Sequence, residues 1–366
     1  MTELADVFRQ YGPQYRAQFG DRMLPSHRQA MRAIVRCRTP AQGGHVYVCD
    51  DCGETQYLYH SCRNRHCPKC QNDKGYLWLE TQQATWLPVR TFMLTFTLPA
   101  DLRQTARRNQ RLIYGLLFRV SAEAVQQLAQ DKRFIGGQMG MVGVLHTWGR
   151  NLAYHPHIHY LMPGGGLADD GTWIPSRANF LLPVKALSRL VRAKFRDGLR
   201  KADPDCFASV PAAAWHIDWV VHCQPVGNGQ HALQYLAPYI FRVAIGNKRI
   251  LKLEHGKITF RYRPTDTAKP KVCTLPAQEF IRRFLQHILP RGFVKVRYYG
   301  FLSHSLQHKL AAIRQQLPPL EHDDRDDSSG DEQDAAPSST YVVRCPVCGQ
   351  VMRRGPLIRP TQRSPP

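Results

Sequence analysis

A short apolar stretch of the chain carries a histidine at every second position. The segment Tyr154–Met162 contains His155, His157 and His159, and most of its other residues are apolar or aromatic. Such a stretch is typical of a buried strand, in which alternate side chains point to the same face of a sheet. Three imidazoles on one face can hold a metal ion, and burying them without a partner is costly. The sequence therefore predicts a sheet that presents a metal site.

Two tyrosines four residues apart, Tyr235 and Tyr239, follow later in the chain. In a helix they would lie on one face, so both phenols could reach a phosphodiester beside the metal. Pro238 would kink such a helix between them. Each motif also has an ordinary explanation: the histidines can be satisfied by polar neighbours, and the tyrosines can pack for their apolar area.

The chain is strongly basic. Its 366 residues include 50 Lys and Arg against 28 Asp and Glu, and eight of those acids lie in the single run Glu321–Asp334. Phosphates recruit basic surfaces through counterion release and steering, so we expect a polyanionic partner such as DNA. The chain has no run of eighteen apolar residues, and its first residues do not resemble a signal peptide. We therefore expect an intracellular protein without a membrane partner.

Cysteines and histidines cluster between residues 37 and 70. Two Cys-x-x-Cys pairs, Cys49 with Cys52 and Cys67 with Cys70, are separated by fourteen residues. This spacing matches a four-cysteine zinc site to which each pair contributes two thiolates. Further candidate ligands lie in the same stretch: Cys37, His45, Cys62 and His66. We expect one or two structural zinc ions, and the sequence leaves open which ligands share an ion.

Basic residues lie among these candidate ligands. Arg63, Arg65 and Lys69 add positive charge to the loop that the cysteines would hold. A compact zinc module with such a loop is a candidate for contacting DNA.

The patterning of the chain indicates helices and strands in irregular alternation. The expected helices are 26–37, 74–87, 101–131 (as one or two), 184–201 and 276–289, and the expected strands are 89–98, 138–148, 154–162, 215–223, 249–253 and 257–263. This order favours an α+β fold with a largely antiparallel sheet.

Four domains are expected from composition. They are a zinc-binding module (1–87), a catalytic domain (88–310), an acidic linker (311–340) that is expected to be disordered, and a basic tail (341–366). The tail contains Cys345 and Cys348, which are either half of a zinc site with ligands borrowed from elsewhere or two free thiols.

Several segments of the chain resemble the two-tyrosine HUH transposases of rolling-circle insertion sequences, which have an N-terminal transposase zinc-binding domain. The resemblance covers roughly residues 25–305, in the family's order, and its segments are 49–53, 61–70, 145–149, 157–159, 235–245 and 287–293. It implies an HUH endonuclease domain with a central antiparallel sheet that carries the histidines, and a tyrosine helix packed beside them.

The resemblance also implies a catalytic Mg²⁺ or Mn²⁺ held by His157 and His159. The nearest candidate for a third ligand is His155, and Gln234 is an alternative. Tyr235 or Tyr239 would attack single-stranded DNA and form a 5'-phosphotyrosine. Arg242, one turn further along, could neutralise the phosphate, or it could be a solvated helix charge.

The implied activity is the nicking and rejoining of single-stranded DNA at element ends and targets, in the bacterial cytoplasm at the nucleoid, with the host replication machinery as a candidate partner. A rolling-circle plasmid replication initiator would share this chemistry. A non-enzymatic zinc-dependent DNA-binding regulator would bind DNA without cutting it. A histidine-triad nucleotide hydrolase would use a histidine nucleophile, but it needs neither the zinc module nor the positive charge.

Overall fold

The computed structural model describes residues 2–71, 78–79, 86–228, 243–263, 269–318 and 342–360. The chain divides into two compact units. Unit 1 comprises Met1–Leu77, Phe241–Arg282 and His322–Pro366, and unit 2 comprises Trp78–Ile240 and Arg283–Glu321. The segments near both chain ends thus share one unit, an arrangement different from the linear order of the expected domains. The expected tyrosine helix, most of the acidic linker and most of the expected helix 74–87 lie outside the described residues. The first residues of the linker 311–340, which was expected to be disordered, instead belong to helix α10 (Lys309–Gln315).

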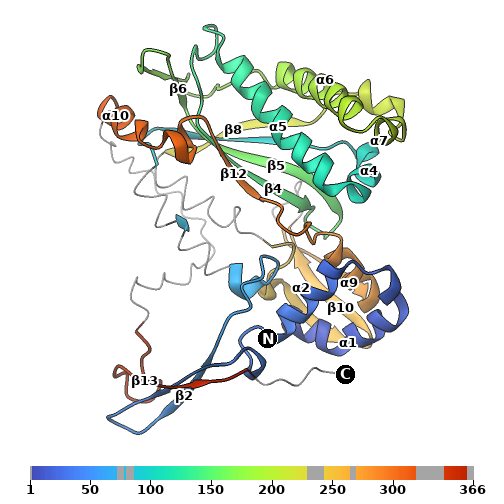
Figure 1. Ribbon diagram of the computed structural model, residues 1–366, viewed down its shortest axis with the longest axis vertical. Coiled ribbons are helices and arrows are strands. Elements are labelled where there is room, and N and C mark those ends of the chain that lie inside the picture. The colour runs from blue at the N-terminus through green and yellow to red at the C-terminus, as the bar shows by residue number, and fades with distance from the viewer. Residues whose placement is uncertain are drawn as a thin grey trace. The chain divides into compact units, whose positions relative to one another are not determined.

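Unit 2 is built on a five-stranded sheet in which all neighbouring strands are antiparallel (Figure 1). The strand order is β12-β4-β5-β3-β8. The strands are β3 (Arg90–Thr97), β4 (Met141–Trp148), β5 (Tyr154–Pro163), β8 (Val221–Asn228) and β12 (Val296–Tyr299). The prediction of an α+β fold with a central antiparallel sheet is confirmed.

Helices cover one face of this sheet (Figure 1). Unit 2 also contains α4 (Arg103–Arg108), α5 (Gln110–Ala129), α6 (Val184–Ala202), α7 (Pro204–Ala208), α10 (Lys309–Gln315) and the short strands β6 (Gly165–Leu167) and β7 (Trp173–Pro175). Ile158 and Tyr160 of β5 lie in the core with the apolar residues of α5 and α6, and the hydroxyl of Tyr160 is 2.8 Å from Ser121 Oγ of α5. Alternate residues of a strand face opposite sides, so His157 and His159 point to the other face of the sheet.

The strand expected at 215–223 begins later, at Val221. Trp215 and Trp219 instead belong to an aromatic cluster with Phe195 of α6, and their indole rings stack with centroids 6.3 Å apart. The hydroxyl of Ser188 donates to the backbone carbonyl of Trp219 at 2.7 Å. Tryptophan has a high strand propensity, but here packing against α6 holds this backbone outside the sheet.

Unit 1 has its own core of helices and a small antiparallel sheet. Its elements include α1 (Leu4–Phe19), α2 (Pro25–Arg36), β9 (Ile250–Glu254), β10 (Lys257–Tyr262), β11 (Lys271–Pro276) and the first part of α9 (Ala277–Leu285). The hairpin β9–β10 confirms the expected pair of strands, and β11 adds an unexpected third strand next to β10. A backbone N–H of α1, that of Leu4, donates to Asn247 Oδ1 at 3.1 Å. This hydrogen bond connects the segment that contains Asn247 to the N-terminal helix.

A second three-stranded sheet in unit 1 joins segments from opposite parts of the sequence. It contains β1 (Gly44–Val48), β2 (Thr55–Tyr59) and β13 (Arg353–Ile358), in the order β13-β1-β2. Both pairings are antiparallel. The tail therefore contributes a strand to the N-terminal module.

The packed core of unit 2 leaves no room for a side chain at Gly143 in β4. A Cβ atom added there would lie 2.6 Å from Cε1 of the fully buried Tyr160 ring. We expect Gly143→Ala to lower the free energy of unfolding by about 1–3 kcal/mol through overpacking. Gly115→Ala, in the middle of α5 with nothing within 4 Å of the new atom, is the matched control and should raise stability by about 0.5–1 kcal/mol. Urea denaturation of both variants measures the difference, and equal effects would contradict the packing described.

Candidate functional site

Three histidines meet on the sheet face opposite to α5 and α6. His157 and His159 project from β5, and His146 of β4 pairs directly with His157 in the antiparallel register. One ring nitrogen of each histidine lies within 4.8 Å of the others. The ring centroids are 4.6 Å apart for His157 and His159, and 5.0 Å apart for His146 and His159. Three imidazoles so placed can ligate one transition-metal ion.

Hydrogen bonds fix two of these rings. Nδ1 of His157 donates to the backbone carbonyl of His155 at 2.7 Å, and Nδ1 of His159 is 2.8 Å from the hydroxyl of Thr95 in β3. Engaging Nδ1 sets the orientation of a ring and leaves Nε2 as the atom available to a metal. The third ring, His146, is 2% exposed and stacks on Trp148 with centroids 4.8 Å apart.

His155, the nearest candidate for a third ligand, lies outside this group. Its Nδ1 lies 2.9 Å from a guanidinium nitrogen of Arg103 at the start of α4. Burial, and then the positive charge of Arg103, lower the pKa of His155. The sheet register explains the difference: the neighbouring strand β4 places His146 opposite His157, where it completes the group.

The turn that joins β4 to β5 is held by a buried histidine, His287. Its Nε2 lies 3.2 Å from the carbonyl oxygen of Leu152, a turn residue in the left-handed region with φ of 63°. Its Nδ1 lies 3.2 Å from the hydroxyl of Thr147. Burial lowers the pKa of His287 to about 3. The neutral ring can therefore donate to Leu152 and accept from Thr147, which fixes the hairpin that carries the three grouped histidines.

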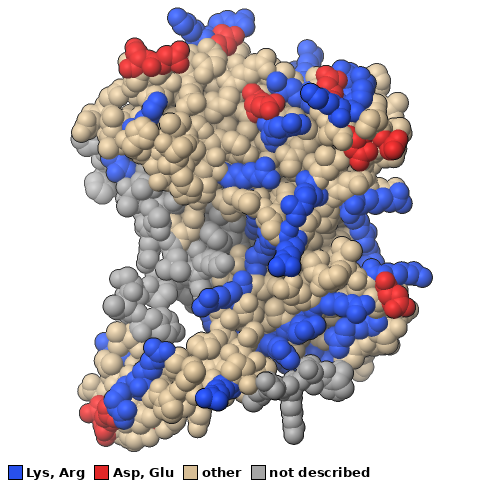
Figure 2. Space-filling model, in the orientation of Figure 1, with Lys and Arg blue, Asp and Glu red and all other residues tan. Residues whose placement is uncertain are grey.

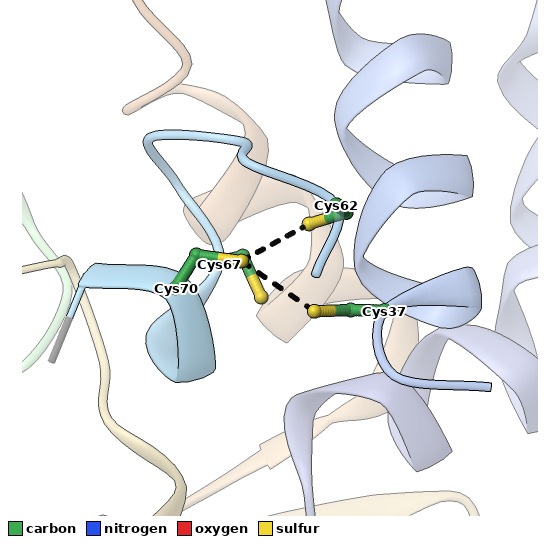
Figure 3. A group of neighbouring side chains, drawn as sticks. All are labelled: Cys37, Cys62, Cys67 and Cys70. Atoms are coloured by element: carbon green, nitrogen blue, oxygen red, sulfur yellow. Dashed lines mark hydrogen bonds between the residues drawn. The ribbon is translucent and has the colours of Figure 1, made fainter. Parts of the chain in front are cut away.

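Four cysteines form a separate group in unit 1 (Figure 3): Cys37, Cys62, Cys67 and Cys70. The sulfur of Cys70 lies 3.5 Å from those of both Cys37 and Cys62. Hydrogen bonds from Cys37 and the other thiols hold the pKa of Cys70 well below its usual range. In a tetrahedral zinc site with Zn–S bonds of about 2.3 Å, the sulfurs lie ~3.8 Å apart, so this group fits a structural zinc ion.

Cys49 and Cys52 do not join Cys67 and Cys70, contrary to the expectation of one shared site. They lie in the turn between β1 and β2, whereas Cys37 and Cys62 flank the open end of that hairpin. Five residues of extended strand span about 17 Å, which keeps the tip far from the base.

A second four-cysteine group forms at this tip. Cys49 and Cys52 lie with Cys345 and Cys348 of the tail, and all four sulfurs lie within 4.8 Å of one another. The tail pair, which the sequence left as half a site or two free thiols, thus meets two further thiols.

The remaining candidate zinc ligands lie outside both cysteine groups. The ring of His45 hydrogen-bonds to Arg354 of β13 and meets the edge of His60 with centroids 5.3 Å apart. The backbone N–H of His66 donates to Asn64 Oδ1 at 2.9 Å. Among the described residues, the cysteines alone form the two four-ligand groups of unit 1.

The candidate DNA-binding residues of the zinc module differ in their surroundings. Arg63 is exposed on a left-handed turn with φ of 53°. Arg65 is half-buried, and burial lowers its pKa. Lys69 forms an ion pair with Glu3 at 2.7 Å, so part of its charge is used within unit 1. Of the three, Arg63 is the most available to a phosphate.

Four other predicted site residues lie outside the described residues: Tyr235, Tyr239, Gln234 and Arg242. Their roles stay predictions. Within the part of the chain that the structure describes, no helix is long and apolar enough to cross a membrane.

Positive charge is widespread on the surface. In Figure 2, Lys and Arg outnumber Asp and Glu on the visible face of each unit. In unit 2, Arg107 and Arg108 of α4 and Arg111 of α5 are exposed, and Arg103 of the same stretch contacts His155 beside the histidine group. This basic stretch suits the backbone of a nucleic acid.

Comparisons with known proteins agree on one kind of protein. A family described as "Transposase zinc-binding domain" matches residues 7–98, and one described as "Putative transposase" matches residues 140–309. A protein named "Putative transposase y4qJ" from Sinorhizobium fredii (strain NBRC 101917 / NGR234) is 43% identical over 337 residues, 86% of this chain and 84% of that protein. The "Transposase for insertion sequence element IS801" of Pseudomonas savastanoi pv. phaseolicola is 28% identical over 295 residues, 75% of this chain and 70% of that protein. No solved structure matches the chain.

The buried and hydrogen-bonded side chain of His287 predicts that the stability of the protein depends on pH. The folded pKa of about 3 lies below the value of about 6.5 for an unfolded histidine, so protonation favours the unfolded chain as the pH falls below about 6.5. Because of this histidine, the free energy of unfolding of the wild type should fall by up to about 1.4 kcal/mol for each pH unit below that value. At neutral pH, the free energy of unfolding of His287→Gln should be lower than that of the wild type by about 1–3 kcal/mol. The variant lacks the pH dependence that this histidine causes, so the difference in unfolding free energy between the two proteins should become smaller toward about pH 5.

Urea unfolding of both proteins over this pH range measures the difference in their free energies of unfolding. His216→Gln, which changes an exposed histidine of the same unit, is the control and should keep the wild-type slope. If the difference in unfolding free energy between the wild type and His287→Gln stays constant with pH, His287 is not held neutral.

Proposed function

Because the chain belongs to the IS91-type family of insertion-sequence transposases, whose substrate is DNA, we propose that it nicks and rejoins single-stranded DNA at insertion-sequence ends during rolling-circle transposition. The observation that carries this proposal is the group His146, His157 and His159 on the sheet face not covered by α5 and α6. A site for polarising a phosphate must leave room for DNA beside the metal ligands.

The proposed reaction uses the two tyrosines that follow β8. A divalent cation bound to the histidines would act as a Lewis acid on the scissile phosphate. Tyr235 or Tyr239 would supply the phenol oxygen that forms a bond to phosphorus, while the bond from phosphorus to the 3'-oxygen breaks. The phenol loses its proton, the 3'-oxygen leaves as a hydroxyl, and the 5'-phosphate stays on the tyrosine. The energy of the phosphodiester is retained, so rejoining needs no ATP.

The donor set bears on the choice of cation. Magnesium prefers oxygen ligands in an octahedral shell, whereas imidazole nitrogens suit first-row transition metals. Three histidines therefore fit Mn²⁺ better than Mg²⁺, although either could complete its shell with water and phosphate oxygens. We propose Mn²⁺ as the better cofactor.

Arginines of α4 and α5 would contact the backbone of the substrate. Arg107, Arg108 and Arg111 are exposed, and Arg103 is tied to His155 next to the ligand His157. A single strand that follows these arginines as far as Arg103 would reach the end of β5 that carries His155, since basic surfaces track a nucleic-acid backbone. Arg63 of the zinc module and Arg242 are proposed as further phosphate contacts.

The relatives help to choose between an element-borne enzyme and a plasmid replication initiator. Both related proteins are named as transposases, and one is named for an insertion sequence. Element ends are therefore the proposed substrate. Host replication proteins are proposed partners for copying the displaced strand.

Covalent trapping tests the tyrosine mechanism. The protein is incubated with Mn²⁺ and labelled single-stranded DNA from the ends of its own element, and adducts that resist denaturation are counted. We expect an acid-stable adduct that requires metal, persists in part in Tyr235→Phe and Tyr239→Phe, and disappears in the double variant. Tyr57→Phe, which changes an exposed tyrosine of unit 1, is the matched control and should react like the wild type. DNA binding without any adduct would favour a zinc-dependent regulator.

Metal titration tests which histidines form the site. His146→Ala should weaken Mn²⁺ binding by at least about tenfold and abolish the adduct, because it removes a ligand. His155→Ala should weaken Mn²⁺ binding less, because the ring contacts Arg103. Calorimetric titration without DNA measures both, and circular dichroism checks folding. A larger effect of His155→Ala than of His146→Ala would reverse the assignment.

A further inference from the structure

Two loops from distant parts of the sequence have the same structure. Cys49–Glu54 and Cys345–Gln350 both read Cys-x-x-Cys-Gly followed by a Glu or a Gln. In each loop the first cysteine N–H donates to the carbonyl five residues later, at 2.9 and 2.8 Å, and the glycine N–H donates back to that cysteine's carbonyl, at 3.0 and 2.9 Å. The glycines, Gly53 and Gly349, have φ of 74° and 77°, in the left-handed region that favours glycine.

The amide groups of both loops also point at sulfur. The backbone N–H of Glu54 hydrogen-bonds to the sulfur of Cys52, and that of Gln350 hydrogen-bonds to the sulfur of Cys348. Such donors stabilise a thiolate, the form in which cysteine binds a metal. Each loop is thus built as a knuckle that presents two thiolates.

The two knuckles face each other. The sulfurs of Cys49 and Cys348 are 3.4 Å apart, as are those of Cys52 and Cys345. A disulfide requires about 2.05 Å and joins sulfurs only in pairs, whereas here all four lie within 4.8 Å of one another. Four thiolates at this spacing match a tetrahedral zinc ion, with sulfurs ~3.8 Å apart.

The sheet around these knuckles has little else to hold it together. Its apolar cluster contains two buried residues besides cysteines, Val343 and Met352, with Tyr47 partly buried against them. Leu357 of β13 is 60% exposed. An ion pair between Arg353 and Asp50 at 3.1 Å is exposed on both sides and contributes little. A sheet with so few apolar contacts gains much of its stability from a metal ion or a comparable cross-link.

We propose that Cys49, Cys52, Cys345 and Cys348 bind a second structural zinc ion, which makes a zinc ribbon from the two distant parts of the chain. The ion fastens β13 and its knuckle to the β1–β2 hairpin, so the C-terminal tail becomes part of the N-terminal zinc module. The chain between the knuckles includes all of unit 2. This site is separate from the group formed by Cys37, Cys62, Cys67 and Cys70, and it does not depend on the proposed nuclease activity.

Metal content tests the proposal directly. The purified full-length protein should contain two zinc ions per chain by mass spectrometry of the metals, and Cys345→Ser and Cys348→Ser should each contain one. Cys273→Ser, which changes a cysteine outside both groups, is the matched control and should retain two. Replacement of zinc by Co²⁺ should give the spectrum of two tetrathiolate sites in the wild type and of one in the tail variants. One zinc in the wild type, or two in the tail variants, would overturn the proposal.

Proteolysis tests the fastening of the tail without reference to metal content. Trypsin cleaves after Arg353 and Arg354, both of which lie in β13. Zinc-loaded wild type should be cleaved there at least about tenfold more slowly than Cys345→Ser, because the strand must detach before it can be cut. Cys273→Ser should behave like the wild type. Equal cleavage rates in all three proteins would mean that the metal does not hold the tail.

Discussion

The pairing of β4 with β5 is the constraint on which the candidate active site depends. It sets His146 opposite His157, and a shift by one residue would send every side chain of a strand to the other face. The register is specified by packing of the core and by the connecting turn. Tyr160 is buried toward α5 and hydrogen-bonded to Ser121, and His287 hydrogen-bonds to Leu152 in the connecting turn. Core packing and a buried polar clamp thus position the three imidazoles.

Local patterns predicted those parts of this arrangement that lie within one element. Alternation along β5 placed His157 and His159 on one face. Hydrophobic periodicity gave β3 and α6 to within a few residues, and the expected helical stretch 101–131 contains α4 and α5. His146 was beyond such reasoning because its place in the site follows from strand pairing, which one sequence does not reveal. Its only signal was its position in another expected strand. Trp215 and Trp219 show the reverse error, in which packing overrode strand propensity.

The cysteines show the same limit over a longer range. The spacing between Cys52 and Cys67 fits a shared zinc site, but a β-hairpin holds one pair at its tip and leaves the other near its base. The partner of the tip pair lies almost three hundred residues away in sequence, at Cys345 and Cys348. The repeated Cys-x-x-Cys-Gly pattern was the available sequence signal. It identifies two similar knuckles without stating that they face each other.

The donor types distinguish the candidate metal sites of the two units. Thiolates are soft ligands that select zinc and hold it in a closed tetrahedral shell, which suits a structural role. The three imidazoles of unit 2 leave coordination positions for water and a phosphate oxygen, which suits catalysis.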